Sequence, residues 1–338
     1  MRALAARGPI SARGVAGPQM RAAGVEAILP AEGLAVMGAA ELLGHLGRLR
    51  AARAALKRAL VEPTDAFIGV DAPDFHLPVA RAATRRGVPT VGYVAPQVWA
   101  WRPGRIPAIE EALDLLLCLF DWEPALFPNT RAVWVGHPAI DRVQPRDPAI
   151  VDRSVYGLLP GSRRQELRRH LPLFLEAAAE LRRRAGGQNR PAPRFRMVLP
   201  PEVSTASLGV ALPPWIERRD RVADLDIAAA ALTKSGTVTL ELALLGVPQV
   251  VAHRVSPLTF WIGRALIRGV QHIALPNILS DREGLAPAVP EHIQTRDAGM
   301  LAAEILGLPE RQAVPLGALG GPGQAERAAD AVWELLHA

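Results

Sequence analysis

The sequence is poor in cysteine and in long apolar runs, and each shortage excludes a class of protein. Cys118 is the single cysteine among 338 residues, so no disulfide can form within the chain and a reducing compartment is indicated. The cysteine and histidine pairs of a structural zinc site are absent. The longest apolar runs fall short of the roughly 20 residues that a membrane-spanning helix requires, and the first residues lack the apolar core of a signal peptide. We therefore expect a cytoplasmic protein.

Lysine is scarce as well. Of the 39 basic residues only Lys57 and Lys234 are lysines, and the excess over 33 acidic residues gives a formal net charge of +6. Arginine binds phosphate or carboxylate through two parallel donors, so the composition indicates anionic partners such as a nucleotide or an anionic membrane surface. Nucleic acid is disfavoured, because the arginines are dispersed and no basic patch interleaved with aromatic residues occurs.

Short apolar runs alternate with longer helix-like stretches, a pattern typical of parallel sheets covered by helices. The Pro- and Arg-rich stretch 138–153 lacks hydrophobic periodicity and is the best linker candidate. We predict an α/β chain of two doubly wound domains, 1–150 and 151–338, with a ligand cleft between them. The last helix, over 325–336, is a candidate for crossing back to the first domain. Strands are predicted at 66–70, 90–94, 115–120, 132–135, 155–159, 196–199, 227–232 and 249–252.

A carboxylate follows the predicted strand that ends at Val70. Asp71 stands at the carboxyl end of that strand, where α/β enzymes place their chemistry, so it is a candidate general base. Its alternative role is to cap the next helix, and spacing alone does not decide between the two. His137 follows another predicted strand end, where its side chain can hydrogen-bond either a ligand or a turn.

Two glycine-containing turns in the second half each join a predicted strand to the start of a helix. Their residues are Gly161, Ser162 and Arg163 in the first turn, and Ser235, Gly236 and Thr237 in the second. Free N–H groups at a helix start attract anions, so the pair indicates a nucleoside diphosphate, with Glu241 available to the ribose. The alternative is two ordinary helix starts, with Ser162 as a cap and Glu166 and Glu241 facing the helix dipoles. Neither turn is a phosphate loop and no G-x-G-x-x-G occurs, which disfavours ATPases and dinucleotide enzymes.

Two kinds of apolar feature suggest contact with sugars or lipids. Trp99 and Trp101 share one loop, where indoles can stack on sugar rings or acyl chains or can anchor the loop. The stretches 42–60 and 257–268 place apolar and basic residues at helical spacing, which suits an anionic membrane surface or a packed helix with a solvated face.

Eight runs of the sequence resemble the lipid-A-disaccharide synthase family and occur in the order of that family. They are GVAGPQM (14–20), LAVMG (34–38), IGVDAPDF (68–75), PQVWAWRPGRI (96–106), VGHP (135–138), LLPGSR (158–163), SGTVTLELALLGVPQVV (235–251) and LPNIL (275–279). The resemblance implies a GT-B glycosyltransferase, with two Rossmann-like domains facing a cleft and with no metal or organic cofactor. The family begins with a strand and a G-E-x-S-G-D loop, whereas Met1 aligns within the helix that follows them. We therefore expect that strand to be missing and residues 1–7 to be the tail of a helix.

The resemblance also implies a reaction. The sugar 2,3-diacylglucosamine passes from its UDP donor to 2,3-diacylglucosamine 1-phosphate, which gives a β-1′,6-linked disaccharide and UDP with inversion. In this scheme Asp71 takes the proton of the acceptor 6-hydroxyl, while Arg163 and the two turns stabilise the departing diphosphate. Glu241 holds the ribose and Asn277 lines the same pocket. The acylated substrates imply a peripheral position on the cytosolic face of the inner membrane, and homo-oligomerisation stays open.

Two other interpretations remain open at this point. The chain can be a UDP-sugar epimerase of the same fold, which product analysis with UDP-N-acetylglucosamine alone would reveal. It can also be a truncated, inactive homologue, which would bind UDP without turnover.

Overall fold

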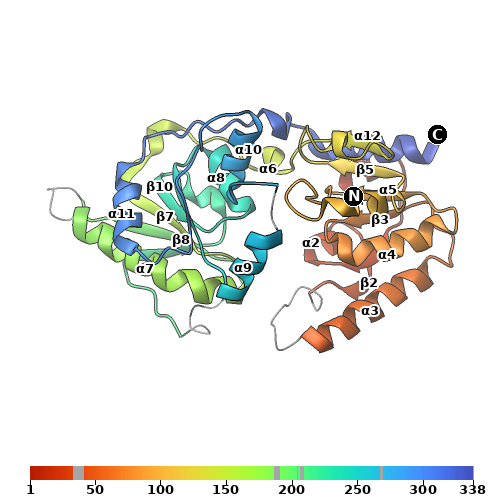
Figure 1. Ribbon diagram of the computed structural model, residues 1–338, viewed down its shortest axis with the longest axis horizontal. Coiled ribbons are helices and arrows are strands. Elements are labelled where there is room, and N and C mark those ends of the chain that lie inside the picture. Colours follow the sequence, from red (N-terminus) through yellow and green to blue (C-terminus); the bar gives the residue numbers. More distant parts are fainter. Residues whose placement is uncertain (33–41, 186–190, 204, 206–208, 267–268, 338) are drawn as a thin grey trace. The chain divides into compact units, whose positions relative to one another are not determined.

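The structure is a computed structural model that describes residues 1–32, 42–185, 191–203, 205, 209–266 and 269–337 (Figure 1). The family-like run at 34–38 lies outside the described residues. The chain divides into two compact units, unit 1 with Met1–Pro138 and Ala318–Ala338, and unit 2 with Ala139–Gly317. The sequence prediction placed the division near residue 150.

The segment just after Pro138 belongs to unit 2 because of what it contacts. Its helix α6 (Ala139–Arg142) packs against α8 (Thr237–Leu245). A little further on, Val143 joins the apolar cluster beneath α8. The backbone N–H of Arg146 then donates to the carbonyl of Leu245 at 3.0 Å. These contacts outweigh the prolines that made the stretch resemble a linker.

Unit 2 contains a six-stranded sheet in the order β12–β11–β10–β7–β8–β9, and all neighbouring strands are parallel. The strands are β7 (Asp152–Leu159), β8 (Arg194–Val198), β9 (Ile216–Arg219), β10 (Ala228–Thr233), β11 (Gln249–His253) and β12 (Glu291–Ile293). Because the strands are parallel, the turns that follow β7, β10 and β11 lie side by side at one edge of the sheet.

Helices cover both faces of this sheet, which explains why the central strands β10 and β11 are largely apolar. On one face Leu158 joins a cluster with Phe174 and Leu301. On the other face Leu159 packs with Leu242. The helices of the unit after α6 are α7 (Arg164–Ala185), α8, α9 (Pro257–Leu266), α10 (Leu275–Arg282) and α11 (Ala298–Gly307) (Figure 1).

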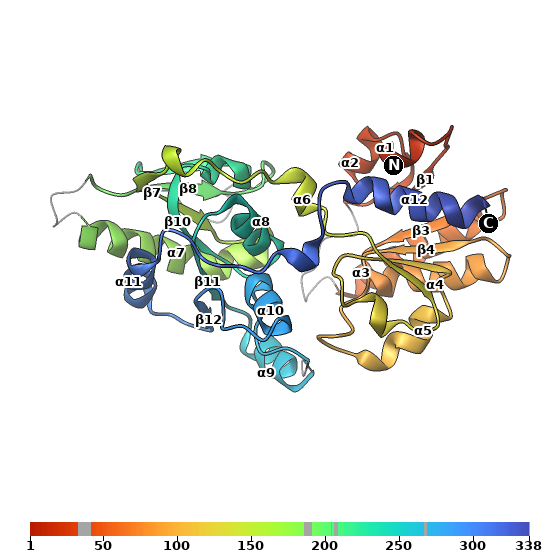
Figure 2. The same ribbon diagram turned by 90° about the horizontal axis from the view of Figure 1, so that it is seen from above.

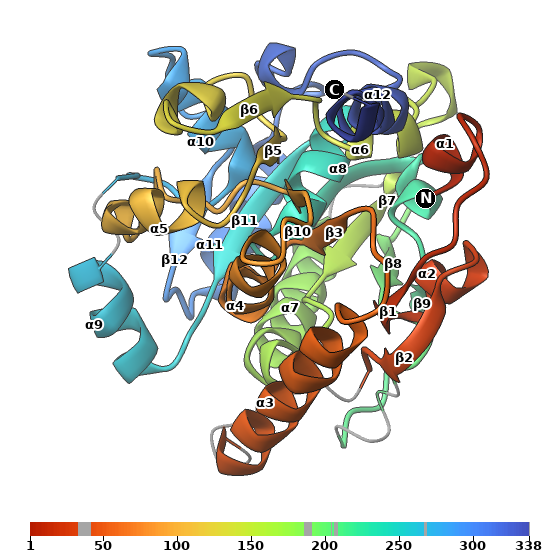
Figure 3. The same ribbon diagram turned by 90° about the vertical axis from the view of Figure 1, so that its right-hand side faces the viewer.

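The described strands of unit 1 form two separate parallel sheets, one in the order β3–β4–β5–β6 and one of β1 and β2 alone (Figure 3). They are β1 (Arg13–Ala16), β2 (Glu26–Pro30), β3 (Phe67–Val70), β4 (Thr90–Tyr93), β5 (Leu115–Cys118) and β6 (Arg131–Trp134). Among the described residues, β3 therefore has a strand neighbour on one side only. Val70 at its carboxyl end is 51% exposed, which fits the end of an edge strand.

The larger sheet of unit 1 is also covered on both faces (Figure 2). Leu115 and Leu117 pack with Val332 and Leu4, which come from the two ends of the chain. Leu116 faces the opposite cluster. The helices are α1 (Arg2–Ala5), α2 (Pro18–Ala22), α3 (Leu42–Ala59), α4 (Pro73–Thr84), α5 (Ile106–Glu110) and α12 (Gln324–His337). The chain thus begins in a helix, as expected, and its last helix belongs to unit 1.

Candidate nucleotide-sugar site

The two glycine-containing turns of unit 2 are neighbours in space. The turn of Gly161 follows β7 and the turn of Gly236 follows β10, and these strands pair directly. The backbone N–H of Lys234 donates to the carbonyl of Leu159 at 2.9 Å, so the ladder continues into both turns. The parallel sheet thereby places two helix starts side by side.

The backbone N–H groups of the first turn bind a carboxylate from the helix that follows it. The backbone N–H groups of Ser162 and Arg163 donate to Oε2 of Glu166 at 3.2 and 3.3 Å. Gly161 has φ +115°, and a Cβ there would lie 2.8 Å from the same oxygen, so only glycine fits this approach. The Nζ of Lys234 lies 3.1 Å from Oε1. Although burial opposes its ionisation, the ammonium and the N–H donors hold the pKa of Glu166 below its usual range.

The second turn is open by comparison. Its N-cap is Gly236, which offers no side chain to the helix start. A Cβ at Gly236 would meet only the Nζ of Lys234, at 3.9 Å. The hydroxyl of Ser235 instead donates to the carbonyl of Ile273 at 2.7 Å, which fixes the turn from behind. In the described part of the chain, no side chain caps the helix start at Gly236 and Thr237. Uncapped N–H groups at a helix start attract anions.

Glu241 and Asn277 differ in the contacts that their side chains make. Burial raises the pKa of Glu241, while the Arg142 guanidinium at 3.9 Å opposes that shift. Asn277 is fully buried, and its amide donates to the carbonyl of Val289 at 3.0 Å and accepts from the N–H of the same residue at 2.9 Å. It also donates to Glu291 at 3.2 Å. The amide of Asn277 therefore fastens the segment before β12.

Two histidines lie beneath the turns. The Nδ1 of His170 lies 2.8 Å from the carbonyl of Glu166, which can only accept, and its Nε2 accepts from the N–H of Arg254 at 2.9 Å. These partners require the neutral ring with a proton on Nδ1. The ring of His253 lies 5.8 Å away, and burial lowers the pKa of both histidines, that of His253 to about 4. His170 thus ties the turn after β11 to the same helix turn as Glu166.

Asp71 in unit 1 directly follows β3, as the sequence predicts. Asp71 and Ala72 both have positive φ angles, +48° and +43°, which cost about 1–3 kcal/mol each outside glycine and cluster at functional sites. The N–H of Asp71 donates to the carbonyl of Tyr93 at 2.9 Å, and the residue is exposed. Arg105 pairs with Asp74 at 2.7 Å and thereby fastens the start of α4. The backbone therefore presents the Asp71 carboxylate to solvent.

The two tryptophans of the loop have different surroundings. Trp99 is 8% exposed, and its indole N–H donates to Glu123 at 3.1 Å, so it anchors the loop. Trp101 is 36% exposed, with the guanidinium of Arg102 4.4 Å from its ring. The side chain of His137 is buried, and the backbone N–H of His137 donates to the carbonyl of Leu319 at 2.8 Å. Of these three side chains, Trp101 is the one that reaches the surface.

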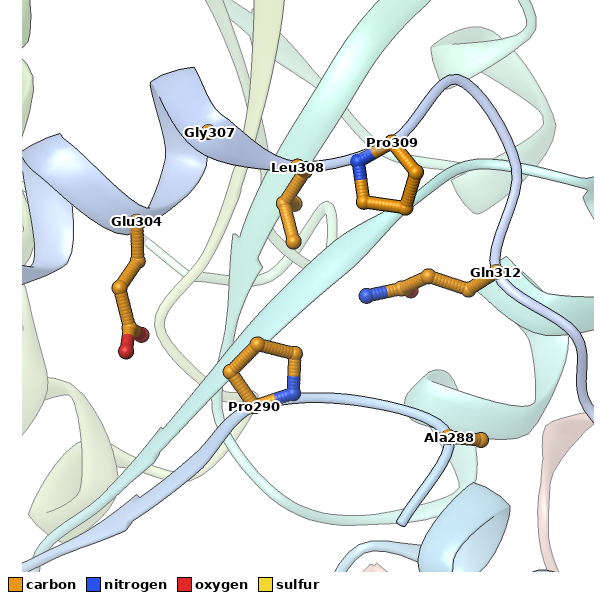
Figure 4. A pocket seen from close by; sticks show the side chains of 7 residues that line it. All are labelled: Ala288, Pro290, Glu304, Gly307, Leu308, Pro309 and Gln312. Carbon is orange, nitrogen blue, oxygen red and sulfur yellow. The ribbon is translucent and has the colours of Figure 1, made fainter. Parts of the chain in front are cut away.

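A hollow of about 400 Å³ in unit 2 lies apart from the turns (Figure 4). Its lining residues are Ala288, Pro290, Glu304, Gly307, Leu308, Pro309 and Gln312. Gln312 bonds to the backbone of Gln249, the first residue of β11, so the hollow opens at the amino ends of the strands. The described residues contain no group of three or more ligating side chains that could hold a metal ion.

Solved structures define the class of fold. The chain is similar to the UDP-GlcNAc 2-epimerase of Methanocaldococcus jannaschii in complex with UDP-GlcNAc and UDP, with 12% identity, a TM-score of 0.53, and coverage of 88% of this chain and 82% of the other. It is also similar to MurG of Acinetobacter baumannii, with 14% identity, a TM-score of 0.50, and coverage of 99% and 93%. The fold is GT-B, as predicted.

Sequence comparisons are more specific. The family model "Lipid-A-disaccharide synthetase" matches residues 1–306. The lipid-A-disaccharide synthase of Geobacter sulfurreducens is 39% identical over 317 residues, 86% of this chain and 78% of that protein. The enzyme of Alkalilimnicola ehrlichii is 40% identical over 314 residues, 87% and 80%. The chain belongs to the lipid-A-disaccharide synthase family, and it is a glycosyltransferase. The likeness to epimerases is one of fold alone.

Proposed function

We propose that the protein transfers 2,3-diacylglucosamine from UDP-2,3-diacylglucosamine to 2,3-diacylglucosamine 1-phosphate, which forms the lipid A disaccharide 1-phosphate and UDP. The observation that carries the proposal is family membership over nearly the whole chain. The arrangement of polar groups in each unit supports a role for that unit in the reaction.

Unit 2 would bind the UDP moiety of the donor. The open helix start at Gly236 and Thr237 offers N–H donors to a diphosphate. The Lys234 ammonium lies beside it and is paired with Glu166 at 3.1 Å. The Arg163 guanidinium is 81% exposed and lies 3.5 Å from Oε1 of Glu166, and it would turn from there toward the same phosphates. Glu241 would accept from the ribose hydroxyls. These groups would stabilise the negative charge that UDP gains as it leaves.

Unit 1 would supply the base. The Asp71 carboxylate would take the proton of the acceptor 6-hydroxyl as its oxygen bonds to the anomeric carbon of the donor. The bond between that carbon and the diphosphate oxygen breaks at the same time, and its electron pair leaves with UDP. Attack opposite to the leaving group inverts the anomeric configuration. Trp101 would stack on a sugar or an acyl chain, while Trp99 and His137 would hold the surrounding backbone.

We also propose that unit 2 rests on an anionic membrane surface, where the acylated substrates reside. No described helix combines the length and apolar character that crossing a bilayer demands. On α9, however, Trp261 is 66% exposed and Arg264 is exposed beside it, a pairing that suits the interface of a membrane.

Incubation of the purified protein with both acylated sugars tests the proposal. We expect release of UDP and a disaccharide phosphate in equal amounts, identified by mass spectrometry. If UDP binds without any product, the protein is an inactive homologue. A 2-epimer formed from UDP-N-acetylglucosamine alone would instead make it an epimerase.

A further inference from the structure

The two neighbouring helix starts of unit 2 differ in whether a side chain binds their backbone N–H groups. At α7 the N–H groups of Ser162 and Arg163, called here the α7 amide pair, already bind the Glu166 carboxylate. At the start of α8, no side chain of the described residues caps the N–H groups beside Gly236. Both turns have the strand, glycine and helix order that attracts phosphate, so their sequences alone do not separate them.

Glu166 also neutralises the positive charge around it. Its Oε1 takes the Lys234 ammonium at 3.1 Å and lies 3.5 Å from the Arg163 guanidinium. The side chains of Glu166 and Lys234 are each 18% exposed, so the pair is largely shielded from water and its interaction is only weakly screened. One carboxylate therefore engages two amides and the Lys234 ammonium, which would otherwise be available to an anionic ligand, and the exposed Arg163 guanidinium lies nearby.

We propose that Glu166 is a specificity-determining residue that acts as an internal anion. It closes the α7 amide pair to phosphate and leaves the α8 start as the one position for the donor diphosphate. The inference rests on the proposed binding of a UDP-sugar, because it assigns the diphosphate to one of two similar turns. Gly161 leaves room for this carboxylate, because a Cβ there would lie 2.8 Å from its Oε2.

Removal of this carboxylate should create an anion site instead of destroying one. In Glu166→Ala the α7 amide pair and the Lys234 ammonium lose their internal partner and face solvent. In Glu166→Gln the amide oxygen still occupies the position, but the negative charge that repels phosphate is gone. Hydrogen bonds to a charged group are stronger than those between neutral groups. We therefore expect affinity for a diphosphate to rise about tenfold or more in Glu166→Ala, and less in Glu166→Gln.

Titration with inorganic pyrophosphate, followed by calorimetry at fixed salt, measures the effect without the substrates. Glu176→Ala is the matched control, because Glu176 is an exposed carboxylate on the same helix. Thermal melts of each variant identify any that fail to fold, and Glu166→Gln, which keeps the side-chain shape, then carries the test. In Glu166→Ala/Lys234→Met the gain should shrink, because the released ammonium is one of the new donors.

Equal or weaker pyrophosphate binding in both folded variants would overturn the inference and make Glu166 a residue that only positions Lys234. An equal gain in Glu176→Ala would also overturn it, because the effect would then come from net charge. Failure of the proposed function is distinguishable. In that case the wild-type protein makes no disaccharide, whereas pyrophosphate still binds more tightly when Glu166 is removed.

Discussion

The two units differ in how their strands are joined into sheets. In unit 2 one six-stranded sheet joins β12 to β9. In unit 1 the described strands divide into a four-stranded and a two-stranded sheet, and β3 is an edge of the larger one. The turns at Gly161 and Gly236 therefore follow inner strands, whereas Asp71 follows a strand that, among the described residues, is paired on one side. An unpaired strand edge is easier to open than an inner strand.

The comparison teaches that the two proposed roles depend on different kinds of support. The turns at Gly161 and Gly236 are held by a sheet, two covering helices and the shared Glu166–Lys234 pair. The position of Asp71 depends on its strained backbone, on the bond to Tyr93 and on the anchored start of α4. Changes in unit 1 should thus affect chemistry first, and changes in unit 2 should affect ligand binding and stability.

The largest effect is expected from Asp71→Asn. The amide cannot take the proton of the acceptor hydroxyl, so kcat should fall about 10²–10⁴-fold. Steady-state release of UDP in the presence of both sugars measures it. Asp65→Asn, an exposed carboxylate before β3, is the control and should keep the wild-type rate. A kcat within about threefold of wild type in Asp71→Asn would remove the general base from the mechanism.

The next largest effect is expected from core substitutions, which compare the stability of the two units. Phe127 in unit 1 and Phe174 in unit 2 are both fully buried, so truncation to Ala should cost about 3–5 kcal/mol at either site. Scanning calorimetry should resolve two transitions, with unit 1 melting first. We expect Phe127→Ala to lower the first transition and Phe174→Ala the second. A single transition that both variants lower equally would contradict the difference between the units.

Acid should destabilise unit 2 through His170, which is buried, and His253, which is half-buried. Burial lowers the pKa of His170, and that of His253 to about 4, below the ordinary value of 6.5. Between pH 6.5 and about 4 the unfolded chain binds protons that the folded unit does not, so stability falls as the pH falls. In unit 1 burial lowers the pKa of His76 in the same direction. Melts across this range should show a weaker pH dependence of the second transition in His253→Asn, and an unchanged dependence would exclude His253 as its source.

A smaller effect is expected at the membrane surface. Loss of the exposed indole in Trp261→Ser should weaken binding to vesicles that contain anionic lipid several-fold, by about 1–2 kcal/mol. Trp134, 40% exposed in unit 1, provides the matched control in Trp134→Ser. Sedimentation with vesicles measures both. Equal losses in the two variants would show that α9 has no special part in docking.

Apolar runs in the sequence predicted every inner strand of the two larger sheets and the edge strands β3 and β6, so all eight predicted strands are confirmed. The strands that were missed are short or polar: β1 and β2 form the small sheet, while β9 and β12 are the edges of the large one. The sequences IERR in β9 and EHI in β12 have no apolar run to recognise. Such strands form because a neighbouring strand offers them hydrogen bonds, which no local pattern records.

The site was predictable as turns but not as contacts. The order of strand, glycine and helix located Gly161 and Gly236. The sequence also offered Glu166 as a carboxylate at the first helix start, but spacing alone did not decide between Glu166 and a phosphate in that turn. One signal for a carboxylate partner was present in the sequence. Lys234 is one of only two lysines, and it lies in the second turn. The engagement of Trp99 by Glu123 and of Asn277 by Val289 depends on tertiary packing and could not be deduced.

In the proposed mechanism, unit 2 binds UDP while unit 1 supplies the base. The affinity of UDP for Asp71→Asn, measured by calorimetry beside the wild-type protein, tests this assignment most directly. Because UDP would be held by unit 2, its Kd should agree within about twofold in the two proteins, although the variant has lost turnover. A Kd weakened by about tenfold or more would contradict the account, because Asp71 would then belong to the donor site.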